Sequence, residues 1–177
     1  PTELRSPQTL APAEVTVALV GTSDLHGYVE PRQLSITDDT GTKRTVEKGG
    51  LALFGGYLRN LRQRHPVLLL DGGDLFQGTM VSNLGEGRAV IDGYNALGYT
   101  AAAVGNHEFD YGPDGPKSVP SSAADDPTGA LKARIASARF PFLSANLIDK
   151  KTSQPVDWPN IYPSKIVQVA GISIGLI

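Results

Sequence analysis

The stretch Thr100–Gly112, "TAAAVGNHEFDYG", places a short apolar run directly before a dense group of polar side chains. The run Thr100–Val104 is small and apolar, which is typical of a strand that is buried on both faces. The next residues present an amide, an imidazole and two carboxylates, namely Asn106, His107, Glu108 and Asp110. A polar turn with its own hydrogen bonds would explain this group, and so would an active site.

Two other loops have the same design. The alternating run "VTVALV" (Val15–Val20) predicts a strand, and Asp24 and His26 follow it in "SDLHG". The apolar run "VLLLD" (Val67–Asp71) predicts a buried strand, and Asp74 follows it in "GGDLFQG". Sites in open α/β sheets form at the carboxyl ends of strands, so we expect the three loops to converge. On an extended segment, the one-residue spacing in "DLH" would turn both side chains to the same face.

The rest of the chain alternates between helical and strand patterns, which predicts an α/β layered fold. Residues 1–14 are Pro-rich and polar and predict a flexible lead-in, which leaves residues 15–177 as one globular unit. We expect a hairpin over residues 34–48 and helices over 50–65, 89–97 and 130–138. We also expect a surface insertion over 112–129, a strand and loop over 140–148, and two strands over 164–177 with a turn at Ala170–Gly171.

Composition excludes several classes of function. The net charge of −2 excludes a broad basic surface, so we expect no binding to a nucleic acid duplex. The chain has no cysteine, which excludes disulfides, thiolate metal sites and a cysteine nucleophile. No apolar run approaches the roughly 20 residues that a membrane span needs.

The polar residues of the three loops suit divalent metal ions. Aspartate and asparagine offer oxygen ligands and histidine offers nitrogen, a set that fits Mn, Zn or Fe better than copper or an iron–sulfur cluster. Taken alone, each loop is also consistent with a plain turn. Three such loops, each directly behind a predicted strand, predict a dinuclear metal site.

The motifs "SDLHG", "GGDLFQG", "GNHEFDYG" and "LSAN" (Leu143–Asn146), in this order, closely resemble the calcineurin-like metallophosphoesterases. Within them the chain resembles the branch of 5′-nucleotidases, UDP-sugar hydrolases and 2′,3′-cyclic phosphodiesterases. The resemblance implies a four-layer α/β/β/α sandwich that hydrolyses phosphate esters, nucleotides above all, with a hydroxide activated by two divalent metal ions. It also implies a periplasmic, secreted or cell-surface location.

The resemblance implies a role for each matching residue. Asp24 and His26 would bind the first metal ion, Asp74 would bridge the two ions, and Asn106 would bind the second. His107, oriented by Asp110, would form the catalytic pair. Asn146 would contact the substrate, and Glu108 would support the loop.

The chain departs from the family pattern in its downstream part. The family has further histidines, including a G-H-x-H motif, and a C-terminal domain that stacks the nucleotide base, whereas this chain has only three histidines. We therefore expect the N-terminal part of a catalytic domain, a sandwich truncated after its N-terminal half. Such a sandwich would expose a strand edge and self-associate. Two alternatives stay open: a non-catalytic module that binds a metal or ligand, and a thiosulfohydrolase-like hydrolase of sulfur esters on the same scaffold.

Overall fold

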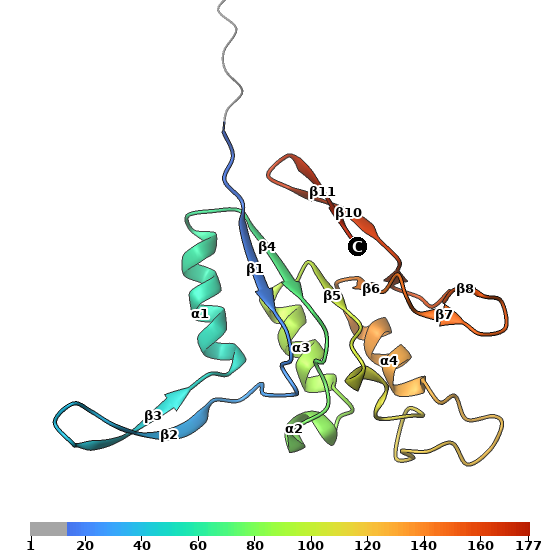
Figure 1. Cartoon of the computed structure of the whole chain (residues 1–177), viewed down its shortest axis with the longest axis horizontal. Helices are drawn as coiled ribbons and strands as arrows, with labels where there is room; N and C mark the ends of the chain where they lie inside the picture. The colour runs from blue at the N-terminus through green and yellow to red at the C-terminus, as the bar shows by residue number, and fades with distance from the viewer. Residues whose placement is uncertain (1–13) are drawn as a thin grey trace, which may run out of the picture.

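The centre of the molecule is a five-stranded parallel sheet (Figure 1). The structure, a computed structural model, describes residues 14–177, so the predicted lead-in lies outside the described residues except for Glu14. The strands lie in the order β1-β4-β5-β6-β9. Their bounds are Ala18–Thr22 (β1), Val67–Asp71 (β4), Ala101–Ala103 (β5), Phe142–Leu143 (β6) and Ile161–Tyr162 (β9).

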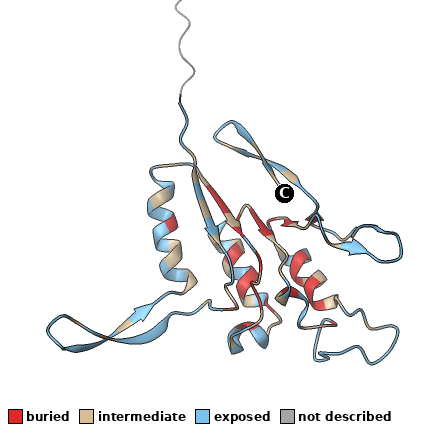
Figure 2. Cartoon of the chain, in the orientation of Figure 1, coloured by how far each residue is buried: buried red, intermediate tan, exposed pale blue. Residues whose placement is uncertain are grey.

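Three helices connect successive strands of this sheet: α1 (Leu51–Arg62), α3 (Arg88–Leu97) and α4 (Gly129–Ser137). Across the sheet, the strands lie in the same order as they occur in the chain. Right-handed crossovers that all proceed in one direction place the three helices on the same face of the sheet. The helices and that sheet face share one buried core (Figure 2), which includes Leu58, Leu69, Val90, Ile91, Tyr94, Ala102, Leu131, Ile135 and Phe142. The expected α/β layered fold is confirmed, and its central sheet is parallel.

Three hairpins extend from this body. They are β2 (Arg32–Thr37) with β3 (Lys43–Lys48), β7 (Ile148–Asp149) with β8 (Gln154–Pro155), and β10 (Lys165–Val169) with β11 (Ile172–Leu176). The predicted turn at Ala170–Gly171 is confirmed, since both residues have positive φ angles, 49° and 81°, as a tight hairpin turn requires.

The structure corrects three details of the sequence prediction. The first strand begins at Ala18 rather than Val15, because its pairing with β4 starts at Ala18 opposite Val67. The segment predicted as a loop after Asp74 contains a short helix, α2 (Met80–Asn83), whose first turn is capped by the Thr79 hydroxyl. The strands β7, β8 and β9 were not predicted, because two residues are too few to show a period.

Within residues 14–177, no helix combines the length and the apolar character that crossing a membrane requires.

Candidate active site

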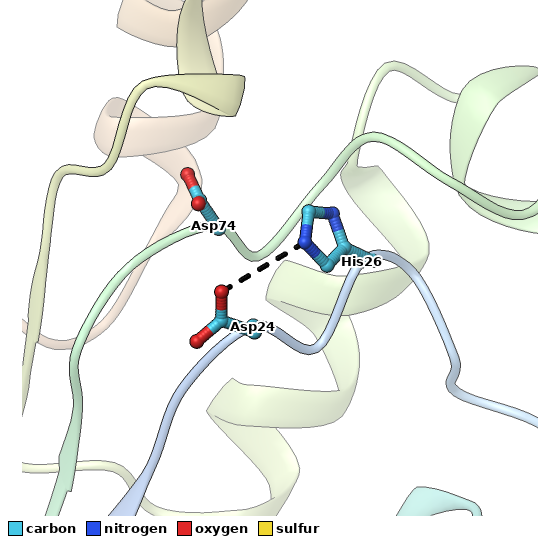
Figure 3. Close-up of side chains that lie close together, drawn as sticks. All are labelled: Asp24, His26 and Asp74. Atoms are coloured by element: carbon cyan, nitrogen blue, oxygen red, sulfur yellow. Dashed lines mark ion pairs between the residues drawn. The ribbon is translucent and has the colours of Figure 1, made fainter.

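Three side chains from two loops converge beyond the ends of β1 and β4 (Figure 3). Asp24 and His26 follow β1, Asp74 follows β4, and one ligand atom of each lies within 4.8 Å of the others. The two strands are neighbours in the parallel sheet, so their loops leave it side by side. The expected convergence of these two loops is therefore present in the structure.

Backbone hydrogen bonds fix the two loops to each other. The Asp24 N–H donates to the Gly73 carbonyl at 3.0 Å, and the His26 N–H donates to the Asp74 carbonyl at 3.0 Å. A third bond, from the Gly27 N–H to the Leu75 carbonyl at 2.8 Å, continues the pairing. The residues that carry the candidate ligands are thus held in a fixed register.

The backbone at all three positions is left-handed. Asp24, His26 and Asp74 have φ angles of 53°, 48° and 58° and are three of the seven non-glycine residues with positive φ in the described structure. This corrects the expectation of an extended "DLH" segment: the side chains meet through two strained residues and not through strand alternation. Such conformations cost about 1–3 kcal/mol each and concentrate at functional sites.

The hydrogen bonding of His26 leaves one ring nitrogen free. Its Nδ1 lies 2.9 Å from the carbonyl oxygen of Gln77, which only accepts, so Nδ1 carries the proton. The other ring nitrogen, Nε2, lies on the Asp24 side of the ring, 3.9 Å from Asp24 Oδ1 (Figure 3). A backbone carbonyl that holds the other nitrogen in this way is typical of metal-binding histidines.

The donor set of the group fits a divalent cation. It combines two carboxylates with one imidazole, which suits Mn, Zn or Fe. In the part of the chain that the structure describes, neither Asp24 nor Asp74 has a lysine or arginine within ion-pair distance. Two adjacent carboxylates without a cationic side chain favour a bound cation.

His107 and Asp110 form a pair next to this group. The short helical turn His107–Phe109 (η1) brings His107 Nδ1 to 2.6 Å from Asp110 Oδ2. This hydrogen bond is the main cause that raises the pKa of His107. The ring of His107 lies edge-on to that of His26 at 5.1 Å between centroids, so the pair adjoins the candidate metal ligands.

The buried carboxylate of Glu108 connects two of the site loops. It accepts hydrogen bonds from the backbone N–H groups of Asp74 (2.9 Å), Leu75 (2.6 Å) and Gly105 (2.7 Å). Its side chain is only 1% exposed, and burial raises its pKa while the three donors oppose that shift. The support expected of Glu108 therefore takes the form of a clamp between the loops after β4 and β5.

The two predicted asparagines are both exposed. Asn106 is exposed in the loop after β5, and none of the side-chain hydrogen bonds found in residues 14–177 involves it. Asn146 is exposed too, and its Oδ1 accepts from the Ser144 hydroxyl at 3.0 Å. It lines a cavity of about 690 Å³ that also includes Thr22 and Asp71, at the carboxyl ends of the strands.

The sequence reading missed one polar residue beside the site. Asp71, the last residue of β4, is 5% exposed and accepts hydrogen bonds from two hydroxyl groups and one backbone N–H. An acid at the end of an otherwise apolar strand was the available signal, because carboxylates are almost never buried without partners.

Comparisons with known proteins follow the same motifs. Residues 18–162 match the calcineurin-like phosphoesterase family. A snake venom 5′-nucleotidase of Gloydius brevicauda is 34% identical over 170 residues, which cover 96% of this chain and 26% of the relative. The chain thus spans about a quarter of the length of the curated relatives that it matches.

Two solved structures are similar to the chain. The 5′-nucleotidase precursor of Thermus thermophilus has a TM-score of 0.67 at 34% identity, covering 89% of this chain and 27% of that chain. A sulfate thiohydrolase of Thermus thermophilus has a TM-score of 0.66 at 18% identity, covering 93% of this chain and 35% of that chain. The second likeness shows the fold alone.

Proposed function

Because this chain belongs to the calcineurin-like phosphoesterase family, we propose that the protein hydrolyses phosphate esters with the help of divalent metal ions. The observation that carries the proposal is the meeting of Asp24, His26 and Asp74 beside the His107–Asp110 pair. Members of this family bind divalent metals, and relatives at more than 30% identity are named 5′-nucleotidases.

Four side chains would hold the metal ions. Asp24 and His26 would bind the first ion, Asp74 would be shared by both ions, and Asn106 would bind the second. The donor set suits Mn, Zn or Fe. Such ions, when bound, lower the pKa of water and neutralise phosphoryl oxygens.

His107 acts on the phosphate group and the leaving oxygen. Its Nδ1 is held by Asp110, which leaves Nε2 as the ring nitrogen that could contact a substrate. The raised pKa favours the protonated ring, which stabilises negative charge on the phosphoryl group and gives a proton to the departing oxygen. Asp110 keeps the ring oriented and charged.

The substrate class that we propose is a nucleotide, and Asn146 is the proposed substrate contact. The names of the relatives support a nucleotide. The contact rests on the "LSAN" motif, since the cavity that Asn146 lines includes none of the proposed metal ligands. A periplasmic, secreted or cell-surface location stays a prediction, which the venom source of one relative supports.

The metal site is tested by calorimetric titration of the protein with Mn²⁺. We expect the Asp74→Asn variant to lose binding, because the amide removes the charge that both proposed ions share. The matched control is Asp92→Asn, which removes an exposed carboxylate from α3 and should bind like the wild type. Equal Mn²⁺ binding by wild type and Asp74→Asn would overturn the proposed site.

The reaction is tested by release of phosphate from a nucleoside 5′-monophosphate with Mn²⁺ present. We expect His107→Ala to lower the rate by about 10²–10⁴-fold, the usual contribution of a general acid. Unchanged hydrolysis in this variant would refute the role of His107. Metal binding without phosphate release would favour a non-catalytic module, and sulfate release from a sulfur ester would favour the thiosulfohydrolase-like alternative.

A further inference from the structure

We propose that Asp71 is a positioning residue that holds the candidate metal ligands Asp24 and Asp74 in place through the backbone of Gly73. The proposal rests on the function proposed above and assigns a role to a buried acid outside the ligand set. It depends on two features of the structure: how the Asp71 carboxylate is fixed, and what its second oxygen holds.

One oxygen of the Asp71 carboxylate is fixed by the core. Asp71 Oδ2 accepts from the Thr22 hydroxyl at 2.6 Å and from the Tyr94 hydroxyl at 2.7 Å. Tyr94 is fully buried on α3, and its ring stacks on Tyr99 at 3.8 Å between centroids. The Tyr99 hydroxyl in turn lies 2.8 Å from the Thr22 hydroxyl. Two hydroxyl groups, one from β1 and one from α3, thus hold the carboxylate in place.

The hydroxyl of Tyr94 is a reliable donor in this network. Burial raises its pKa well above the ordinary value, and the nearby Asp71 carboxylate raises it further. The phenol therefore stays protonated across the range in which proteins are studied.

The other oxygen holds the turn that carries the ligands. Asp71 Oδ1 accepts from the Gly73 N–H at 2.8 Å. The Gly73 carbonyl accepts from the Asp24 N–H, and Asp74 follows Gly73 directly in the chain. One residue, Gly73, therefore connects the Asp71 carboxylate, through its N–H, to the backbone of both acids, through its carbonyl and its bond to Asp74.

Gly73 occupies a position that a larger residue could not take. Its φ angle is 101°, and a Cβ at this position would lie 2.7 Å from the backbone nitrogen of Gly105. Only a glycine fits at this position, where the loop after β4 contacts the loop after β5. The hydrogen bond that the Gly73 N–H donates to Asp71 favours this conformation among the many that a glycine can adopt.

The energetics favour a positioning role over a purely structural one. Burial raises the pKa of Asp71, so the ionised group carries a desolvation cost in the folded protein. Well-packed apolar residues often stabilise a core more than buried charges do. A carboxylate at this strand end is better explained by the turn that it holds than by its contribution to the core.

The test combines hydrogen exchange with Mn²⁺ titration. In the metal-free wild-type protein, we expect the Gly73 amide hydrogen to exchange slowly, because its acceptor is buried. In the titration, Asp71→Ala should weaken Mn²⁺ binding by about 10–100-fold, as loss of outer-shell partners does. Asp71→Asn keeps an acceptor oxygen for the Gly73 N–H and should restore most of the affinity.

The control for general destabilisation is Asn160→Ala. The Asn160 amide donates to the carbonyls of Ile135, Ala138 and Phe140, next to the start of β9 and so at the opposite end of the sheet from the site. This variant should be less stable but bind Mn²⁺ like the wild type.

Each outcome decides the proposal. Fast exchange of the Gly73 amide hydrogen in the wild-type protein would overturn it, even if Asp71→Ala failed to fold. An Asp71→Ala variant that binds Mn²⁺ as tightly as the wild type would overturn it too. Asp74→Asn belongs in the same titration. If Asp74→Asn loses binding and Asp71→Ala does not, only the positioning role fails; if Asp74→Asn binds normally, the proposed function fails.

Discussion

Replacing Glu108 with glutamine should destabilise the protein, although the two side chains have nearly the same shape. The carboxylate of Glu108 accepts three backbone N–H groups with two oxygens. Glutamine has a single acceptor oxygen. With that oxygen directed at Asp74 and Gly105, its NH₂ group would face the Leu75 N–H, which is a donor too.

The size of the effect follows from these bonds. One buried N–H loses its partner, at a cost of about 1–3 kcal/mol, and the two remaining bonds lose the assistance of a charge. Glutamine also avoids the desolvation cost that raises the pKa of Glu108, which offsets part of the loss. We therefore expect a net loss of about 1–3 kcal/mol in the free energy of unfolding, a large part of a typical total of about 5–15 kcal/mol.

The assay is urea unfolding of the metal-free protein at neutral pH, followed by circular dichroism. The matched control is Glu86→Gln, which affects a half-buried carboxylate with one backbone bond, from the Gly115 N–H at 3.0 Å. Glutamine can keep that bond, so the control should stay within about 0.5 kcal/mol of the wild type. Equal unfolding curves for Glu108→Gln and the wild type would show that Glu108 does not clamp the loops.

Three further predictions concern other parts of the chain. Gly105→Ala should abolish Mn²⁺ binding, since its Cβ would collide with the Asp74 carboxylate, whereas Gly175→Ala has open space and should bind normally in calorimetry. The hydrogen bond from Lys132 is the main cause that lowers the pKa of Asp126 from an ordinary 3.8 to about 2. The Lys132–Asp126 pair therefore stabilises the fold above pH 3.8. This stabilisation is lost as the pH falls through about 2. Because the pair is half-exposed, Asp126→Asn should lower the free energy of unfolding by less than about 1 kcal/mol at pH 7. Below pH 2 it should not change that free energy. An equal loss at both pH values in chemical unfolding would contradict this prediction. The outer edge of β1 pairs with no strand among residues 14–177, so light scattering should show self-association that grows with concentration; a monomer at all concentrations would refute it.

The sequence predicted the parts of the fold that have a clear local pattern. The run Val67–Asp71 is a strand with the predicted bounds, and the helix predicted over 89–97 is α3, from Arg88 to Leu97. In such segments, the apolar residues recur at the spacing of a helix or a strand, so the sequence indicates which of the two forms. The first strand was placed three residues too early at its start, because the pairing that defines β1 depends on β4 and not on local pattern.

The sequence by itself also determined which chemistry is present. The absence of cysteine and the polar groups after three apolar runs predicted oxygen and nitrogen ligands before any geometry was known. The alternation of strands and helices then predicted an α/β layered fold, in which the loops at the carboxyl ends of the strands can converge.

Only the tertiary structure decided how those groups are held. Asp24, His26 and Asp74 have a left-handed backbone, which is a property of single residues. The carboxylates of Asp71 and Glu108 hold the loops through hydrogen bonds, several of which join residues more than 30 positions apart. Neither the backbone angles nor these hydrogen bonds produce a periodic pattern in the sequence. Residue types follow from sequence, but the positions of these ligands depend on hydrogen bonds that exist only once the sheet and its helices have packed.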